Sequence, residues 1–413
     1  MDLMLSVFFV SLLVLASGGL FKWMEDVYLT GPLLAMLLGI ILGPIALDLI
    51  HFKDELQAEK SIKIACEFTI AMALMATALR IPANFFRNHF WSQSVIICLG
   101  IVLMCLLSTA VFYILLDGFS LIECLLFGAI ITPTDPVIAA TLITGEKAKK
   151  YLPLLVRRTL SFEAGANDGL AYPVVILAIF LVNNGLSGFP AKEFLLQTIL
   201  YETILCSVIA YIVGRLAGLF MHRSNKHGIM NRKSILPFSL ALAFMLLSGL
   251  DVMGMNGIIG VFVGGMGYAQ YLSKKEDLQE ERVQESMERI FTIPVFFFLG
   301  IALPWQEWMK LGWTAVFICI GILLFRRIPA LLLLMPIIPK FRKKLNDILV
   351  MGWFGPIGVA ALYYALHSKE KTNLEEVWII PTLIVFASTI MHGITSLPFE
   401  RLFYKLKKPD EEG

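Results

Sequence analysis

The sequence predicts an all-α polytopic membrane protein with about thirteen transmembrane helices. Three observations predict this class. The 413 residues are 58% hydrophobic and only 16% charged, which does not fit a soluble domain of this length. Apolar segments of about 20 residues, the length that crosses a bilayer, recur along the chain. Two of these segments carry Gly and Pro at their centres, which predicts helices that break inside the membrane.

Composition also excludes several classes of function. The formal net charge of +2 is too small to suggest a nucleic-acid partner. The six cysteines form no Cys-x-x-Cys pair, so neither a disulfide framework nor a zinc site is expected, and no cofactor is predicted. Met1 and Asp2 precede the first apolar segment without a basic region or cleavage pattern. We therefore expect a retained first helix.

The apolar segments divide the chain into spans and connections. The expected spans are 3–21, 29–50, 61–79, 93–116, 119–143, 153–182, 193–221, 234–251, 256–272, 287–304, 311–338, 347–367 and 376–397. Lys and Arg gather in the connections after odd-numbered spans, which predicts an outside N-terminus and a cytoplasmic C-terminus. The tail 398–413 is short, with no regulatory domain, so a bacterial inner membrane is the expected location. The charge-mixed stretch 273–289 is expected to be a solvated connection.

The first break is expected at Thr132-Pro133-Thr134-Asp135-Pro136. Pro133 and Pro136 remove backbone donors and clash with the preceding turn, so a helix cannot continue here. Broken backbone at membrane depth survives only where protein or a water-filled cavity satisfies it. Thr134 and Asp135 could then offer oxygen ligands to a small dehydrated cation. Equally, Asp135 could cap the second half of the broken helix.

A second break is expected in span 347–367, where Gly352, Gly355, Pro356 and Gly358 follow one another closely. The two broken spans are seven apart, so they enter the membrane in opposite directions. Matched breaks of this kind are typical of inverted repeats with a site at the midplane. We expect one membrane domain over 1–397, with repeats over 3–182 and 234–397 joined by a linker helix at 193–221. Alternatively, these are the ordinary Gly and Pro of membrane helices.

Acidic residues in span 153–182 are the candidate chemical groups. Glu163 and Asn167 share one helix face, and Asp168 lies about 100° further round, toward the first break. A carboxylate at membrane depth is costly and marks a functional site by default. It can hold a proton or a cation but not both, which is the minimum requirement of an antiporter. Glu163 needs a cationic partner, and Arg327 is the candidate.

The remaining intramembrane polar groups have more than one interpretation. Asn167 is expected to hydrogen-bond the broken backbone. Glu67, Glu123, Glu202 and Arg215 could form buried pairs, face an aqueous lumen or reach the membrane interface. His392 is expected to be a packed histidine.

Together, Thr134-Asp135-Pro136 and Glu163-x-x-x-Asn167-Asp168 resemble the NhaP-type, eukaryotic-exchanger-like branch of the monovalent cation:proton antiporters. The break at 352–358 and the arginine of span 311–338 belong to the same pattern, which covers essentially the whole membrane domain. The resemblance implies a homodimer with a core around the broken helices and a separate dimerisation domain. It also implies elevator-like alternating access and a role in pH homeostasis.

The resemblance also implies roles for individual residues. Asp168 would bind the ion or the proton, and Thr134 and Asp135 would complete the site for Na⁺ or K⁺. Glu163 and Arg327 would form a stabilising pair, and Asn167 would tie the two helices together. An Asn-Asp pair implies electroneutral exchange of Na⁺ for H⁺.

Two departures from that pattern leave alternatives open. Ala164 stands where the family often has a serine ligand, which encourages K⁺/H⁺ exchange as a second hypothesis. Phe354 stands where the family commonly has the arginine of a Gly-x-Arg-Gly motif. The role of that arginine is therefore either dispensable here or supplied by another residue. Remote alternatives are a non-transporting sensor or subunit and an intramembrane aspartyl protease. The flanks Thr134-Asp135 and Asn167-Asp168 lack that protease's motifs, and no enzyme activity is expected.

Overall fold

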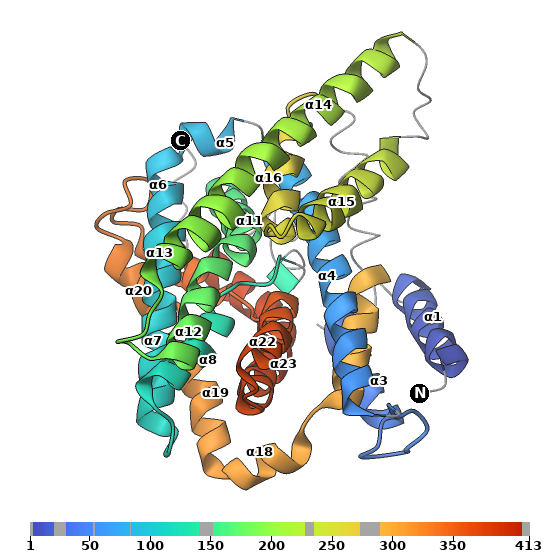
Figure 1. Ribbon diagram of the computed structural model, residues 1–413, viewed down its shortest axis with the longest axis vertical. Coiled ribbons are helices and arrows are strands. Elements are labelled where there is room, and N and C mark those ends of the chain that lie inside the picture. Colours follow the sequence, from blue (N-terminus) through green and yellow to red (C-terminus); the bar gives the residue numbers. More distant parts are fainter. Residues whose placement is uncertain are drawn as a thin grey trace.

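A computed structural model describes residues 3–19, 30–52, 54–82, 84–136, 138–139, 152–227, 235–272 and 290–406, and this part of the chain is helical throughout its regular structure. Figure 1 shows the helices gathered around α22 and α23, with α1 at the periphery. The expected connection 273–289, the end of span 119–143 and tail residues 407–413 lie outside the described residues.

The helices follow the predicted order of apolar segments. They are α1 (Leu3–Gly19), α3 (Gly31–Leu42), α4 (Glu55–Arg80), α5 (Phe85–Asn88), α6 (Phe90–Ser94), η1 (Val95–Leu99), α7 (Gly100–Leu115), α8 (Leu121–Ile130), α11 (Leu154–Leu170), α12 (Tyr172–Asn184), α13 (Ala191–Glu193), η2 (Phe194–Leu205), α14 (Cys206–Lys226), α15 (Ile235–Val252), α16 (Gly257–Ala269), Ile290–Ala302, α18 (Trp305–Leu311), α19 (Trp313–Phe325), α20 (Ile328–Leu334), α21 (Leu345–Trp353), α22 (Val359–Thr372) and α23 (Glu376–Leu406).

Several helices are long and apolar enough to cross a membrane. Within the described residues there are six: Leu56–Arg80, Phe90–Leu115, Leu154–Asn184, Ala191–Lys226, Trp313–Leu334 and Glu376–Thr395. A pair bent by 63°, Ile290–Ala302 with Trp305–Leu311, makes a possible seventh span. Other predicted spans contain shorter apolar helices, because breaks and Gly-Pro pairs interrupt them. The chain is an integral multi-pass membrane protein, as its composition predicted.

Helix ends follow from local sequence. Ser120 and Glu123 form a capping box at the start of α8: the Ser120 hydroxyl accepts from the Glu123 amide at 3.2 Å, and the Glu123 carboxylate accepts from the Ser120 amide at 2.7 Å. This cap accounts for Glu123, one of the acidic residues that the sequence left open. At the other end of the chain, α23 continues past the expected boundary at residue 397 to Leu406.

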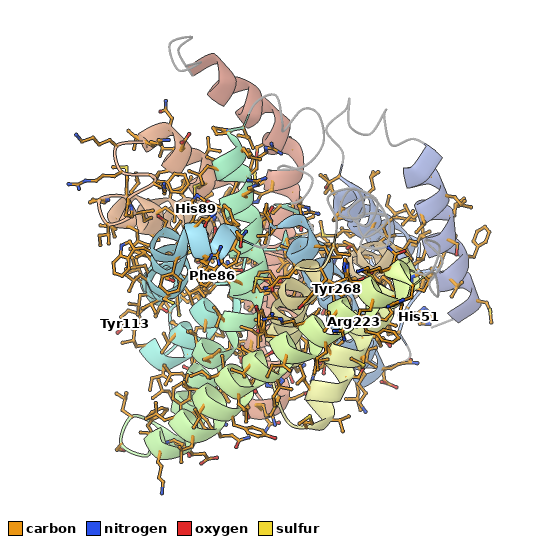
Figure 2. The ribbon with its side chains drawn as sticks, turned by 90° about the horizontal axis from the view of Figure 1, so that it is seen from above. His51, Phe86, His89, Tyr113, Arg223 and Tyr268 are labelled. Carbon is orange, nitrogen blue, oxygen red and sulfur yellow. The ribbon has the colours of Figure 1, made fainter. Side chains whose placement is uncertain are left out.

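Small residues allow the helix Ala191–Lys226 to pack closely against α16. The predicted linker 193–221 is the continuous helix Ala191–Lys226, whose second half is α14. A Cβ atom on Gly214 would lie 1.9 Å from the Gly264 carbonyl oxygen of α16, so only glycine permits this approach. The Tyr268 hydroxyl of α16 also bonds Met221 of α14. Figure 2 shows Tyr268 beside α14, whose end carries Arg223.

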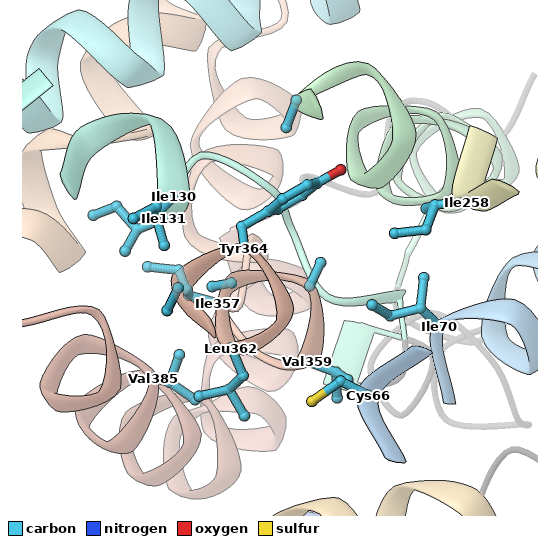
Figure 3. Packing of buried hydrophobic residues seen from close by; sticks show 14 of the residues in the cluster. Cys66, Ile70, Ile130, Ile131, Ile258, Ile357, Val359, Leu362, Tyr364 and Val385 are labelled. Atoms are coloured by element: carbon cyan, nitrogen blue, oxygen red, sulfur yellow. The ribbon is translucent and has the colours of Figure 1, made fainter. Parts of the chain in front are cut away.

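The two broken spans lie in the middle of the apolar core. Ile130 and Ile131 end the first half-helix, and Ile357 lies in the second break; all three are buried in one cluster. Figure 3 shows them together, with Val359 and Tyr364 of α22 close by. Burial of both breaks removes them from lipid, which non-helical backbone at membrane depth requires.

Candidate functional site

The first break lies where the two prolines predicted it. Helix α8 ends at Ile130, residues 132–135 are not helical, and helical backbone resumes at Pro136. Thr134 and Asp135 are 2% and 1% exposed. The Asp135 amide donates to the Pro356 carbonyl at 2.8 Å, so the two breaks touch through their backbones.

The second break lies between α21, which ends at Trp353, and α22, which begins at Val359. The Asp135 carboxylate reaches across to it: Oδ2 accepts from the Val359 amide at 2.7 Å, while Oδ1 accepts from the Ile138 amide at 3.1 Å. Asp135 therefore caps amides that follow both breaks, where the helix dipole is positive. The sequence suggested a cap on its own half-helix but did not suggest the bond to α22.

Two glycines of the second break make room for this arrangement. A Cβ atom on Gly358 would lie 1.8 Å from Asp135 Oδ2, and one on Gly355 would lie 2.2 Å from Arg327 Cδ. Any larger residue would displace the carboxylate or the guanidinium stem. Gly352 is also close to its neighbours, with a Cβ position 3.1 Å from Ile328 Cα.

Asn167 joins α11 to the first break. Its Nδ2 donates to Thr134 Oγ1 at 2.7 Å, and its Oδ1 accepts from the Thr134 amide at 3.2 Å. The next residue, Asp168, is 1% exposed, and neither carboxylate oxygen has a hydrogen-bond partner among the described residues. The structure thus joins Thr134 to Asn167, places Asp168 next to Asn167 in α11, and leaves the Asp168 carboxylate without a hydrogen-bond donor in the described part of the chain.

The backbone at Asp168 is held by two residues that the sequence did not single out. Tyr364 of α22 donates its hydroxyl to the Asp168 carbonyl at 2.5 Å, and Asn256 donates to the Gly169 carbonyl at 3.1 Å. Pro173 has no amide to donate to Gly169, which frees that carbonyl. Asn256 was recognisable as an N-cap before the glycine-rich helix α16, because it also accepts from the Ile258 and Ile259 amides.

Glu163 and Arg327 form a bidentate ion pair. The two nitrogen–oxygen distances are 2.5 Å, and both side chains are 2% exposed. Arg327 Nε also donates to the Met351 carbonyl of α21 at 2.8 Å. Arg327 lies at an interruption between α19 and α20 that the sequence analysis did not predict, although Pro329 marks it.

The neighbouring Arg326 contacts both breaks. Its Nη1 donates to the carbonyls of Ile131, Thr132 and Pro133 at 2.7, 3.1 and 3.3 Å, and its Nη2 donates to the Gly355 carbonyl. The sequence pointed to Arg327 as the partner of Glu163 and left Arg326 without a role. The available signal was a pair of arginines in an apolar segment, of which Glu163 needs only one.

Helix α23 completes the polar contacts of the second break. Ser388 Oγ accepts from the Ile357 amide at 2.8 Å, and His392 Nε2 lies 3.0 Å from the Trp353 carbonyl oxygen. His392 is 4% exposed. Most backbone groups that the breaks release therefore find side-chain partners from distant parts of the chain.

The other open candidates have different partners, although the Glu202 carbonyl accepts from the Asn256 amide at 3.2 Å. The Arg215 Nε donates to the Tyr271 hydroxyl at 3.2 Å, and the Glu202 side chain accepts from Gln197 at 3.1 Å. Glu67 is partly buried on α4. None of them bonds the residues of the two breaks in the contacts described above.

Two broken spans that meet in the core beside a buried carboxylate define a class: multi-pass membrane proteins with an ion site at a helix crossing. The profile of the transmembrane sodium/hydrogen exchanger family matches residues 8–400. The chain belongs to this family.

Individual relatives agree with this assignment. The chain is 27% identical to a Na⁺/H⁺ antiporter of Saccharomyces cerevisiae over 89% of its own length and 40% of that relative's. It is 28% identical to Na⁺/H⁺ antiporter 2 of Zygosaccharomyces rouxii, of which it covers 49%. It thus spans about half or less of these two fungal relatives. The Na⁺/H⁺ antiporter NhaP of Pseudomonas aeruginosa is 24% identical, over 80% of this chain and 79% of that one.

The fold is similar to that of the sodium proton antiporter MjNhaP1 from Methanocaldococcus jannaschii. The TM-score is 0.73 at 18% sequence identity, and the match covers 98% of each chain. At this identity the likeness concerns the fold alone.

Proposed function

We propose that this protein exchanges Na⁺ for H⁺ across a membrane, one for one and without net charge movement. The observation that carries the proposal is the Asp168 carboxylate, buried to 1% exposure with no hydrogen-bond partner on either oxygen among the described residues. A buried carboxylate in this state needs a positive charge, which a proton or a monovalent cation can supply. Alternation between the two is antiport.

Charge balance at the crossing supports a one-for-one ratio. Glu163 is paired with Arg327, Asp135 accepts from backbone amides after both breaks, and Arg326 donates to backbone carbonyls at both breaks. Each of these charges has its compensation inside the protein. Asp168 is then the group whose charge varies, and a single carboxylate carries one proton or one monovalent cation.

The contacts also favour particular ligands. Thr134 Oγ1 accepts a hydrogen bond from Asn167. We assign it, together with the Asp168 carboxylate, as an oxygen ligand for Na⁺. Asn167 and the Glu163–Arg327 pair position the site. We assign Asp135 to capping, because both of its oxygens already accept backbone amides. Pro133, Pro136, Gly352, Gly355, Pro356 and Gly358 shape the two breaks.

For the whole molecule we propose about thirteen spans in two inverted repeats, 3–182 and 234–397, joined by the linker helix. The meeting of the two breaks at Asp135 and Pro356 supports this arrangement. We further propose a homodimer in a bacterial plasma membrane, with the N-terminus outside, that exchanges ions by elevator-like alternating access and serves pH homeostasis. Cross-linking in the membrane tests the dimer, and protease protection tests the orientation.

K⁺/H⁺ exchange on the same scaffold is the second candidate. Ala164 is buried at 2% exposure next to Glu163 and offers no oxygen. A site with fewer protein ligands compensates less of the free energy of dehydrating the ion, which favours the more easily dehydrated K⁺.

The test is proton flux in reconstituted liposomes with Na⁺, K⁺ or Li⁺ added in turn, with and without a K⁺ ionophore to clamp the voltage. We expect Na⁺-driven flux that the clamp does not change and that Asp168→Asn abolishes, because asparagine cannot exchange a proton. Flux with K⁺ alone would select the second candidate. Full exchange in Asp168→Asn would reject the site.

A further inference from the structure

We infer that Arg326 is a positioning residue that acts as a fixed internal cation: it occupies the backbone carbonyls of both breaks and so keeps the transported ion on Asp168 and Thr134. The inference rests on the proposed function and deepens its account of the ion site. It starts from a property of broken helices: the last carbonyls before a break lack amide partners and point into the gap. Such carbonyls are good ligands for a dehydrated alkali ion.

In the first break these carbonyls are already occupied. Ile131, Thr132 and Pro133 each direct a carbonyl oxygen at Arg326 Nη1, between 2.7 and 3.3 Å away. They immediately precede Thr134, the candidate ligand. Without the guanidinium, three backbone oxygens next to the ion site would be free to bind the same cation.

The second break uses the other end of the same group. Arg326 Nη2 donates to the Gly355 carbonyl, just beyond the end of α21. One guanidinium thus serves the negative ends of both half-helices, which together carry roughly one negative charge. The geometry mirrors Asp135, whose single carboxylate serves amides after both breaks.

The chain has no other cation for this task among the contacts described. Arg327 is committed to Glu163 and the Met351 carbonyl. Phe354, inside the second break, is 1% exposed and packs in an apolar cluster with Leu331 and Met351, so it brings no charge. Arg326 is itself 3% exposed, and burial of a guanidinium is costly unless its donors find partners; here both Nη nitrogens bond backbone carbonyls.

A planar guanidinium suits this role better than an ammonium. It carries several donors in a rigid fork, so it can bond oxygens on two helices at once. Lysine in its place would keep the charge but not reach all four carbonyls. Glutamine would remove the charge and free most of the carbonyls. The two substitutions therefore release the carbonyls in graded fashion.

The experiment compares Arg326→Gln and Arg326→Lys with wild type in two measurements. The first is the Na⁺ concentration that half-maximally drives proton flux in liposomes, together with the maximal rate. The second is the rise in unfolding temperature of the detergent-solubilised protein with NaCl, against choline chloride, which needs no transport. The matched control is Arg215→Gln, which removes an exposed arginine of α14 whose Nε bonds the Tyr271 hydroxyl.

For Arg326→Gln we expect the half-maximal Na⁺ concentration to fall on the order of tenfold, because freed carbonyls add ligands. The maximal rate should fall as well, because a more tightly held ion leaves more slowly, and the Na⁺-dependent stabilisation should grow. Arg326→Lys should shift in the same direction by less. A purely structural arginine would lower the unfolding temperature without changing Na⁺ dependence, and that result overturns the inference.

Two further outcomes are also decisive. If Arg326→Gln does not fold, Arg326→Lys decides: a lowered half-maximal Na⁺ concentration supports the inference, and an unchanged one overturns it. If wild type shows no exchange, the proposed function is wrong, but this result does not decide the inference about Arg326. The Na⁺-dependent stabilisation of the two variants still tests whether Arg326 shields the carbonyls.

Discussion

At the scale of single residues, the site depends on groups that approach one another too closely for any extra atom. Gly358 is the clearest case, because a methyl group there would lie 1.8 Å from the Asp135 oxygen that caps α22. We expect Gly358→Ala to displace that carboxylate, to cost about 1 kcal/mol or more through the lost cap, and to abolish most exchange. Flux and unfolding temperature measure the two effects.

Gly249→Ala is the matched control for this prediction, because a Cβ atom there meets nothing within 4 Å. It should leave both quantities near those of wild type. Exchange at the wild-type rate in Gly358→Ala would show that the Asp135 cap has no part in transport.

The structural role of a residue could be predicted from sequence where the residue acts on its own helix. Pro133 and Pro136 break their own helix, so the first break could be placed from sequence. Arg326, Ser388 and His392 could not be assigned in this way, because their partners are carbonyls and amides from segments far along the chain. Their roles exist only once the two breaks meet.

At the scale of secondary-structure elements, the Glu163–Arg327 pair fastens α11 to the interrupted helix α19–α20 and, through Met351, to α21. Glu163→Gln would leave a buried guanidinium without its counter-charge, which typically costs about 3–5 kcal/mol. We expect a large drop in unfolding temperature. The double variant Glu163→Gln/Arg327→Met should recover part of it, because no charge is then left unpaired.

Glu307→Gln serves as the control, since within the described residues Glu307 on α18 makes only a distant contact with Lys310, at 4.0 Å. If Glu163→Gln and Glu307→Gln melt alike, the buried pair contributes nothing measurable. The existence of the Glu163–Arg327 pair could be proposed from sequence because two opposite charges in apolar spans need each other. The interruption at Arg326 and Arg327 was missed, because span 311–338 is apolar enough to suggest one continuous helix.

At the scale of the whole molecule, α4, which carries no break, is tied to the end of α22 by two ion pairs. Lys63 contacts Glu370 at 2.5 Å, and Lys369 contacts Glu59 at 2.6 Å. The side chains are 11–49% exposed, and pairs of this kind contribute little, about 0–1 kcal/mol each. They are therefore weak enough to open and close if α22 moves past α4 during transport.

Cys66 can report that movement, because it lies on α4 one turn from Lys63, is fully buried and belongs to the same buried cluster as Val359 of α22 (Figure 3). Lys63→Glu places two like charges together, so we expect this end to open more often and Cys66 to react several-fold faster with a membrane-impermeant thiol reagent. Lys63→Glu/Glu370→Lys should restore the slow reaction, and Cys66→Ser should remove this signal. Equal Cys66 reactivity in wild type, single and exchanged variants would mean that α4 and α22 stay joined throughout the cycle.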